Sequence, residues 1–242
     1  MRRTKPPGGI RRGPAPRSLK PPARDRGRRG GIVTAAPSHP AAPRRSAALL
    51  AAAALLLSCG SHRSRLQDGD IVFQTSLSAQ SEAIQHATHS PYSHVGMVLL
   101  QNGHPFVFEA EGQVRFTPLQ EWIARGQAHR YAAKRLRDPR LLSDPTKLDA
   151  LRKAALSYAG KPYDPYFDWS DDRMYCSELV WKVFHEGLGV ELGDLQPLSS
   201  FDLSDELVAG KLAQRYGSKV PMDEKVISPS AIFNSPLLAD VR

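Results

Sequence analysis

The sequence predicts an α+β fold, in which a small antiparallel sheet or partial β-barrel packs against helices. Short apolar runs typical of strands come first in the body of the chain, and helical patterns follow them. Asn102-Gly103 separates two such runs and is a strong signal for a tight hairpin. The stretch from Cys59 to the end of the 242-residue chain is long enough for one domain with its own hydrophobic core.

The first elements of this body are strands around one helix. Asp68-Gly69-Asp70 is a turn signal, and the apolar run behind it predicts a strand. A polar stretch with three apolar residues on one face predicts a helix, which Pro91 ends. Two apolar runs then flank the hairpin turn. We expect strands at residues 71–73, 93–100 and 106–110, and a helix at 78–88.

The later elements are mostly helices. Residues 114–116 and 129–136 predict two more strands, with a short helix at 118–124 between them. Asp144-Pro145 combines a capping side chain with proline at the first helical position, so a helix begins there and continues to Tyr158. A helix from Ser177 is expected to end at Gly187 as its C-cap, and another spans residues 204–216.

The positive charge of the chain is confined to its N-terminal segment. The formal net charge is +9, yet residues 1–58 hold 13 Lys and Arg against the single acid Asp25. The remainder holds 20 basic and 23 acidic residues. A nucleic-acid partner for the folded part therefore has no electrostatic support.

Residues 1–45 are rich in Arg, Pro, Gly and Ala and have no apolar periodicity. Such a segment cannot bury a core, so we expect a disordered basic extension. It is long for the basic region of a signal peptide, which makes Val33 an alternative translation start.

Residues 46–59 have the features of a lipoprotein signal. Arg44-Arg45 precede the small and apolar residues 47–57, a run too short to span a bilayer but suited to a signal-peptide core. The run ends in Leu56-Leu57-Ser58-Cys59-Gly60, which resembles a bacterial lipobox whose cysteine is lipidated. An ordinary signal peptide or a chance apolar run is the alternative.

The lipobox interpretation divides the remaining chain and locates the protein. It makes residues 60–67 a tether and residues 68–242 the folded domain. It anchors the protein through Cys59 to a membrane of the cell envelope. Gly60 follows where an Asp would signal inner-membrane retention, which favours the periplasmic face of the outer membrane in a Gram-negative cell.

Cys176 is a candidate nucleophile. It lies where a loop meets the expected helix from Ser177, and the unpaired N–H groups at a helix start favour a thiolate. Cys59 is the one other cysteine, so Cys176 has no partner in the body of the chain for a disulfide. The alternative is a small buried apolar residue without a chemical role.

His94 is the best candidate for the base. A thiol nucleophile needs a base within hydrogen-bond reach and a third group that orients this base. His94 begins a strand, and Gly96 on the same face leaves room for a substrate or another backbone to approach. The hairpin returns Glu109 to its neighbourhood as the orienting group, with Glu111 on the same strand face as the competitor. The other histidines are expected at the surface or at helix ends.

Local spacing gives no sign of a metal or a cofactor. The chain has no CxxC, HxxxH or HExxH pattern, and the acidic residues 168–172 lack the spacing of a calcium loop. Glycine-rich phosphate loops are also missing. We therefore expect no cofactor, and a solvated acidic loop at residues 168–172.

Four segments together resemble the permuted papain-like cysteine hydrolases. They are Gly69-Asp70-Ile71-Val72-Phe73, Tyr92-Ser93-His94-Val95-Gly96, Phe108-Glu109-Ala110 and Tyr175-Cys176-Ser177-Glu178-Leu179-Val180. This group is related to NlpC-type cell-wall peptidases, and the match is closest to the YiiX/YaeF-type amidases. The resemblance extends from Asp68 to the C-terminus and implies a circularly permuted papain-like fold.

The resemblance also implies roles for the matching residues. Cys176 would be the nucleophile, His94 the base and Glu109 the orienting residue, while Tyr175 would flank the oxyanion site. The expected function is that of an envelope lipoprotein that cleaves amide or ester bonds through a thioacyl enzyme, acting as a monomer on peptidoglycan peptides or acylated lipids. An acyltransferase with the same chemistry and a non-catalytic binding lipoprotein are the alternatives.

Overall fold

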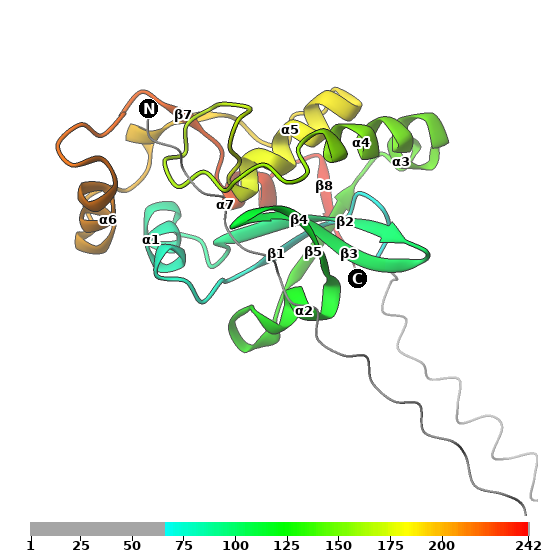
Figure 1. Ribbon diagram of the computed structural model, residues 1–242, viewed down its shortest axis with the longest axis horizontal. Helices are drawn as coiled ribbons and strands as arrows, with labels where there is room; N and C mark the ends of the chain where they lie inside the picture. Colours follow the sequence, from blue (N-terminus) through cyan, green and yellow to red (C-terminus); the bar gives the residue numbers. More distant parts are fainter. Residues whose placement is uncertain (1–65, 242) are drawn as a thin grey trace, which may run out of the picture. The chain divides into compact units, whose positions relative to one another are not determined.

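The computed structural model describes residues 66–241, except for the side chain of Ala79 (Figure 1). The expected basic extension, the signal core, the lipobox with Cys59 and most of the tether lie outside these residues. Within the described part, no helix combines the length and the apolar character needed to cross a bilayer.

A six-stranded sheet forms the centre of the fold, in the order β4-β3-β2-β1-β5-β8. Every neighbouring pair is antiparallel, so the predicted α+β fold with an antiparallel sheet is confirmed. The strands are β1 (Ile71–Gln74), β2 (His94–Gln101), β3 (His104–Glu111), β4 (Gln113–Pro118), β5 (Ala132–Leu136) and β8 (Leu238–Asp240). A separate two-stranded sheet pairs β6 (Gln196–Pro197) with β7 (Lys225–Val226).

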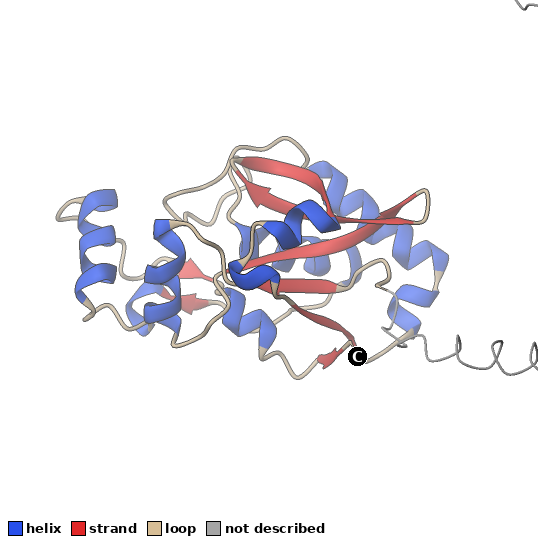
Figure 2. Ribbon diagram, turned by 90° about the horizontal axis from the view of Figure 1, so that it is seen from below, coloured by secondary structure: helices blue, strands red, loops and turns tan. Residues whose placement is uncertain are grey.

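Helices cover both faces of the six-stranded sheet (Figures 1 and 2). In Figure 1, α4 and α5 lie above the sheet, α2 lies below it, and α6 lies beside α1. The helices are α1 (Ala79–Thr88), α2 (Leu119–Ala124), α3 (Arg140–Ser143), α4 (Pro145–Ser157), α5 (Cys176–Leu188), α6 (Glu206–Tyr216) and α7 (Pro229–Phe233).

Alternation along β1 divides the core into two parts. Ile71 and Phe73 point to the face that packs against α5, in the larger apolar cluster. Val72, between them, points to the opposite face and joins Trp122 of α2 in a smaller cluster. Successive side chains of a strand point to opposite faces, and here both faces are buried. The sheet is therefore packed on both faces.

The start of α4 follows the predicted capping chemistry, and two further helices have side-chain caps. The Asp144 side chain accepts a hydrogen bond from the backbone N–H of Thr146, and Pro145 occupies the first helical position of α4. Ser78 and Asp205 cap α1 and α6 in the same way. Each cap satisfies a backbone donor that the helix leaves unpaired.

The predicted end of α5 is wrong. Gly187 lies inside the helix, and the cap is Gly189, which has a left-handed φ of 67°. A Cβ at Gly187 would come within 2.7 Å of the Leu151 Cα atom, so this glycine lets α5 approach α4 closely. Packing, rather than helix termination, therefore accounts for Gly187.

The strand expected at residues 129–136 is shorter than predicted. It begins at Ala132, because residues 127–129 form a 3₁₀ turn in which Ala128 and His129 both have positive φ. The short elements α3, α7, β6, β7 and β8 had no counterpart among the predicted elements. Each is too short to show an apolar period of its own.

Candidate active site

Cys176 is the first residue of α5, directly after Tyr175 in extended conformation. Its side chain is buried, with 5% of its surface exposed. The sulfur accepts hydrogen bonds from the backbone N–H groups of Ser177 and Val95. The helix start and the head of β2 thus both direct donors at one sulfur atom, and donors of this kind favour a thiolate.

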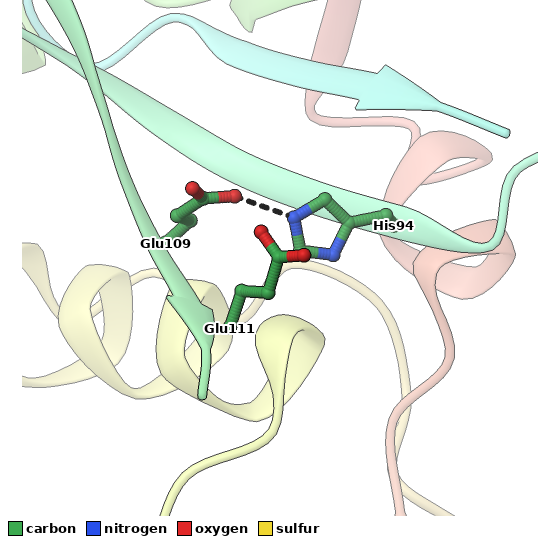
Figure 3. A group of neighbouring side chains, drawn as sticks. All are labelled: His94, Glu109 and Glu111. Atoms are coloured by element: carbon green, nitrogen blue, oxygen red, sulfur yellow. Dashed lines mark hydrogen bonds and ion pairs between the residues drawn. The ribbon is translucent and has the colours of Figure 1, made fainter. Parts of the chain in front are cut away.

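His94 is the first residue of β2 and lies between Cys176 and Glu109. Its Nε2–H donates to Glu109 Oε2 at 2.7 Å. A dashed line marks this hydrogen bond in Figure 3. The imidazole is also hydrogen-bonded to the Cys176 thiol. Because Nε2 is engaged by Glu109, Nδ1 is the nitrogen available to the sulfur. The Trp122 ring stacks beside the imidazole at 6.1 Å between centroids.

Glu109 is fully buried in β3. Besides His94, its carboxylate accepts a hydrogen bond from Thr117 Oγ1 at 2.6 Å and one from Arg125. Burial alone would raise the pKa of this carboxyl, but the hydrogen bond with His94, supported by Thr117 and Arg125, lowers it to about 2. Glu109 is therefore a carboxylate at every physiological pH.

The pKa values of His94 and Cys176 shift toward an ion pair. Burial alone would lower the pKa of His94, but hydrogen bonds with Cys176 and Glu109 raise it to about 9. Burial alone would raise the pKa of the Cys176 thiol, but the hydrogen bond and the charge of His94 lower it below its usual value. Each partner stabilises the charged form of the other.

Glu111 lies on the same strand but in a different environment. About half of its side chain is exposed, and its carboxylate pairs with Arg115 at 3.4 Å and with Arg125. The described hydrogen bonds of His94 go to Glu109 and to Cys176. The hairpin thus brings Glu109 into hydrogen-bond contact with the imidazole, whereas Glu111 lies near it without a described hydrogen bond to it.

Tyr175 forms part of the wall beside the nucleophile. Its hydroxyl accepts a hydrogen bond from the backbone N–H of Ile227 at 3.1 Å, and its own backbone N–H donates to Glu178. Its ring packs edge-on against Phe167. The residue therefore joins the start of α5 to the C-terminal segment as well as to the loop before α5.

The loop of residues 163–175 is anchored to α5. Lys182 Nζ donates to the backbone oxygen of Ser170 at 2.6 Å and to Asp171 at 2.8 Å, and it forms an ion pair with Glu178 at 2.9 Å. Burial raises the pKa of Glu178 to about 7, although Lys182 acts against this shift. The acidic loop is thus tied to the helix that carries the cysteine.

Two residues near the nucleophile were missed by the sequence analysis. Gln80 of α1 donates through Nε2 to the Tyr163 hydroxyl at 2.8 Å and accepts from Arg215 at 3.0 Å. Gln80 and Tyr163 line both hollows that border Cys176. They come from a polar helix and a loop, where no spacing or motif pointed to a site.

The two hollows differ in character. One, of about 740 Å³ including open solvent at its mouth, is lined mainly by apolar side chains of α1, α6, the loop before α5 and residues 226–229. The other, of about 650 Å³, has a mixed lining, in which serines, Glu111 and Arg125 accompany apolar side chains such as Ile84 and Ala110. Cys176 borders both, so this residue lies where a strongly apolar compartment meets one of mixed lining.

His94, Glu109 and Glu111 also form a group with the donor atoms of a metal site. One atom from each lies within 4.8 Å of the others, although they come from two strands and share no local spacing (Figure 3). These donors are already engaged: Arg125 pairs with both carboxylates, and the raised pKa of His94 leaves its Nε2 protonated. In this arrangement the residues do not fit a cation, which would have to displace Arg125 and a proton.

A helix that begins with a cysteine, beside an antiparallel sheet that supplies a histidine and a carboxylate, defines a papain-like class of hydrolase fold. In this chain the histidine strand precedes the cysteine helix. The chain belongs to the family described as "Permuted papain-like amidase enzyme, YaeF/YiiX, C92 family", whose model matches residues 65–242. Membership of this family makes the protein an amidase or peptidase-type enzyme. The predicted family and the predicted fold are confirmed.

Two relatives from Escherichia coli support this assignment. The uncharacterized protein YiiX of strain K12 is 48% identical over 187 residues, which cover 77% of this chain and 91% of that protein. A crystal structure described as the metalloprotein YiiX from strain O157:H7 has 49% identity and a TM-score of 0.70, and the match covers 73% of this chain and 96% of that one.

Proposed function

We propose that the protein is a cell-envelope thiol hydrolase that cleaves an amide or ester bond through a thioacyl enzyme. The observation that supports this most is the hydrogen-bonded series Cys176, His94 and Glu109, with the cysteine at a helix start. A nucleophile, a base and an orienting carboxylate are the groups that covalent acyl transfer needs.

Each group has one role in the proposed reaction. The Cys176 thiolate attacks the carbonyl carbon and forms a C–S bond, while the backbone N–H of Cys176 stabilises the oxyanion. His94 gives its proton to the leaving nitrogen or oxygen as the bond to the carbonyl carbon breaks. It then takes a proton from water, which attacks the thioester and releases the acid and the thiolate.

The substrate classes that agree with this chemistry are peptidoglycan peptides and acylated lipids. An acyltransferase would use the same thioacyl enzyme and replace water by an alcohol or an amine. A non-catalytic envelope lipoprotein, in which Cys176 is only structural, is the alternative from another class. The envelope location rests on the lipobox interpretation of Cys59, through which the protein would be anchored to the membrane.

Intact-mass measurement after incubation with cell-envelope extract tests the hydrolase proposal. The wild-type chain should gain an acyl mass at Cys176 that neither Cys176→Ala nor His94→Ala acquires, and the added mass identifies the acyl group. If an activity-based thiol probe and the extract both leave Cys176 unmodified, the proposal is wrong and the binding lipoprotein becomes the better account.

A bound metal is the second candidate, because the E. coli structure is described as a metalloprotein and His94, Glu109 and Glu111 offer three donors. The ion pairs of Arg125 oppose it, so we expect the purified protein to carry less than one metal ion per chain. Elemental analysis of wild-type protein and Glu111→Gln decides this. One tightly held ion in the wild type that is lost in the variant would contradict the expectation.

A further inference from the structure

A third hollow lies where β1 ends, against the turn between α2 and β5. Its volume is about 960 Å³ including open solvent at its mouth, and Cys176 is not among the described residues that line it. We call it the tyrosine hollow. Its polar and aromatic lining side chains are those of Gln74, Thr75, Tyr92, Gln127, Arg130 and Tyr131.

The tyrosine hollow adjoins the hollow that contains His94. An antiparallel bridge between Ser76 and Gly126 separates the two. Thr75 and Gln127, the neighbours of the bridge on one side, line the tyrosine hollow, whereas Ser76 and Arg125 line the other hollow. A molecule in the tyrosine hollow therefore lies next to the candidate active site without occupying it.

Gln74 supplies a buried amide to this hollow. It is the cross-strand partner of His94, and 2% of its surface is exposed. Its side-chain oxygen has no hydrogen-bond partner in the part of the chain that the structure describes. A buried polar atom without a partner costs about 1–3 kcal/mol, so it points to a partner from outside the chain. Because the terminal torsion of an amide is soft, Gln74 can offer its oxygen or its NH₂ group to a ligand.

The backbone around this amide has an unusual conformation. A Cβ at Gly126 would come within 2.3 Å of Gln74 Oε1, so a glycine is needed for the amide to lie where it does. Ala128 and His129 have positive φ values of 53° and 54°, a conformation that costs roughly 1–3 kcal/mol per residue and that clusters at ligand sites. The wall of the hollow therefore depends on a glycine and on a conformation that ordinary residues avoid.

Two tyrosine side chains give the hollow its aromatic surface. The Tyr92 ring packs against Phe73 and Phe233, at 5.8 and 4.3 Å between ring centroids. Tyr131 is 40% exposed, and its ring packs edge-on against Trp122 at 6.3 Å. Each tyrosine combines an apolar ring face with a hydroxyl group that can donate and accept.

This lining matches the chemistry of a sugar. The C–H face of a sugar ring packs on an aromatic ring, and its hydroxyl groups donate and accept hydrogen bonds, as the amides and phenols of the hollow do. A purely apolar ligand would leave those polar groups unpaired. A cationic ligand would find no carboxylate, since Arg130 is the charged residue among the described ones that line the hollow.

We propose that the tyrosine hollow is a binding site for a saccharide. Gln74 forms hydrogen bonds with the sugar hydroxyls, and the ring of Tyr131 packs against the C–H face of the sugar. The site lies beside the candidate active site and does not depend on the proposed hydrolysis. A free oligosaccharide and the sugar headgroup of a lipid share this chemistry.

Titration of the full chain with two soluble disaccharides is the primary test. Diacetylchitobiose, whose sugars carry acetamido groups, and maltose, whose sugars do not, are followed by calorimetry and by protein-observed NMR. At least one of them should bind saturably and shift the resonances of Gln74, Tyr92 and Tyr131. The absence of saturable binding by both, or shifts confined to residues outside the hollow, would overturn the proposal.

Variants locate the binding. Tyr131→Ala, at an exposed position, should weaken disaccharide binding about tenfold through loss of the ring face. Gln74→Leu, of similar size without the amide, should weaken it by a similar factor. Tyr166→Ala is the matched control, because Tyr166 is 46% exposed in the loop before α5 and lies outside the described lining of the hollow. Binding that Tyr131→Ala leaves unchanged, or that Tyr166→Ala weakens equally, would contradict the proposed site.

Vesicles distinguish the two sources of the sugar. They carry a glycolipid with the same headgroup sugar as the bound disaccharide, and vesicles without glycolipid are the control. Displacement of the disaccharide by the glycolipid vesicles alone would support the site and assign it to a lipid headgroup. Retention of the disaccharide would support the site and assign it to a free oligosaccharide. Displacement by both kinds of vesicle would overturn the proposal, because a lipid surface without sugar would then occupy the hollow.

Discussion

At the scale of single residues, the reactivity of the site depends on how Cys176 and His94 stabilise each other's charged form. Glu109 is buried, ionised and hydrogen-bonded to the imidazole, so it favours the imidazolium. The imidazolium in turn favours the thiolate. An ion pair of this kind is competent for attack without a prior proton transfer.

The pH dependence of activity follows from these shifts. His94 must be protonated to release the leaving group, and its pKa is raised to about 9, so kcat/KM should fall as the pH rises through about 9. On the acid side, kcat/KM should fall where the thiolate is protonated, below the usual range of a thiol. Steady-state kinetics from pH 4 to 10 measures both limbs. An alkaline limb near pH 6.5, the ordinary value of a histidine, would contradict the pairing.

Substitutions of the two glutamates of β3 should have different effects on kcat/KM. Glu109→Gln removes the charge that holds the imidazolium, so it should lower kcat/KM by about tenfold to a hundredfold and move the alkaline limb to lower pH. Glu111→Gln, whose carboxylate is half-exposed and paired with arginines, should change activity by less than about threefold. A larger loss at Glu111 than at Glu109 would reverse the assignment of the orienting residue.

Sequence patterns located some of these residues and missed others for a physical reason. His94 and Glu109 lie on two strands of one hairpin, so a local pattern was enough to predict their proximity. A local pattern marked Cys176 as a candidate nucleophile at a helix start, and the family resemblance implied its place beside His94. Gln80 and Arg125 reach the site only through tertiary packing of α1 and α2. No periodicity in the chain encodes that packing.

At the scale of elements, the contact between α4 and α5 sets the position of the helix that carries Cys176. Gly187 lies in this contact, against the backbone of Leu151. The pattern of the sequence suggested a helix end there, because a glycine near the end of an apolar period has the same local signature as a C-cap. Only the neighbouring helix distinguishes the two.

Gly187→Ala should destabilise the fold. The new Cβ would lie 2.7 Å from the Leu151 Cα, a backbone atom that cannot move aside cheaply, and we expect a loss of about 1–3 kcal/mol in the free energy of unfolding. Gly210→Ala in α6 is the matched control, since no atom lies within 4 Å of its added Cβ. It should stabilise by about 0.5–1 kcal/mol through helix propensity. Chemical denaturation of both variants checks the signs, and equal effects would refute the packing role of Gly187.

At the scale of the whole molecule, the strand-first, helix-later order of the chain was enough to predict an antiparallel sheet covered by helices. The closing strand β8 and the short helix α7 could not be predicted, because their residues form regular structure only through pairing with β5 and packing beneath α5. The N-terminal predictions concern residues outside the described part and stay predictions.

Lipidation is the prediction that belongs to the complete chain. If the proposed lipobox is used, the mature protein begins at Cys59 and partitions into detergent, because more than one acyl chain gives stable membrane binding. Labelling with a fatty-acid analogue should mark the wild type, and Cys59→Ser should remain unlabelled. A mature N-terminus elsewhere on an unlabelled wild-type protein would contradict the lipoprotein proposal.

The central claim, that Cys176 and His94 form one reactive pair, is tested most directly by the pH dependence of alkylation at Cys176. Peptide-resolved mass spectrometry after iodoacetamide treatment from pH 4 to 10 follows this thiol separately from Cys59. Alkylation of the wild type should stay fast below pH 7, because the imidazolium and the helix start both favour the thiolate. In His94→Ala the midpoint should move to higher pH. A midpoint that His94→Ala leaves unchanged, or slow alkylation of the wild type at every pH, would contradict the account.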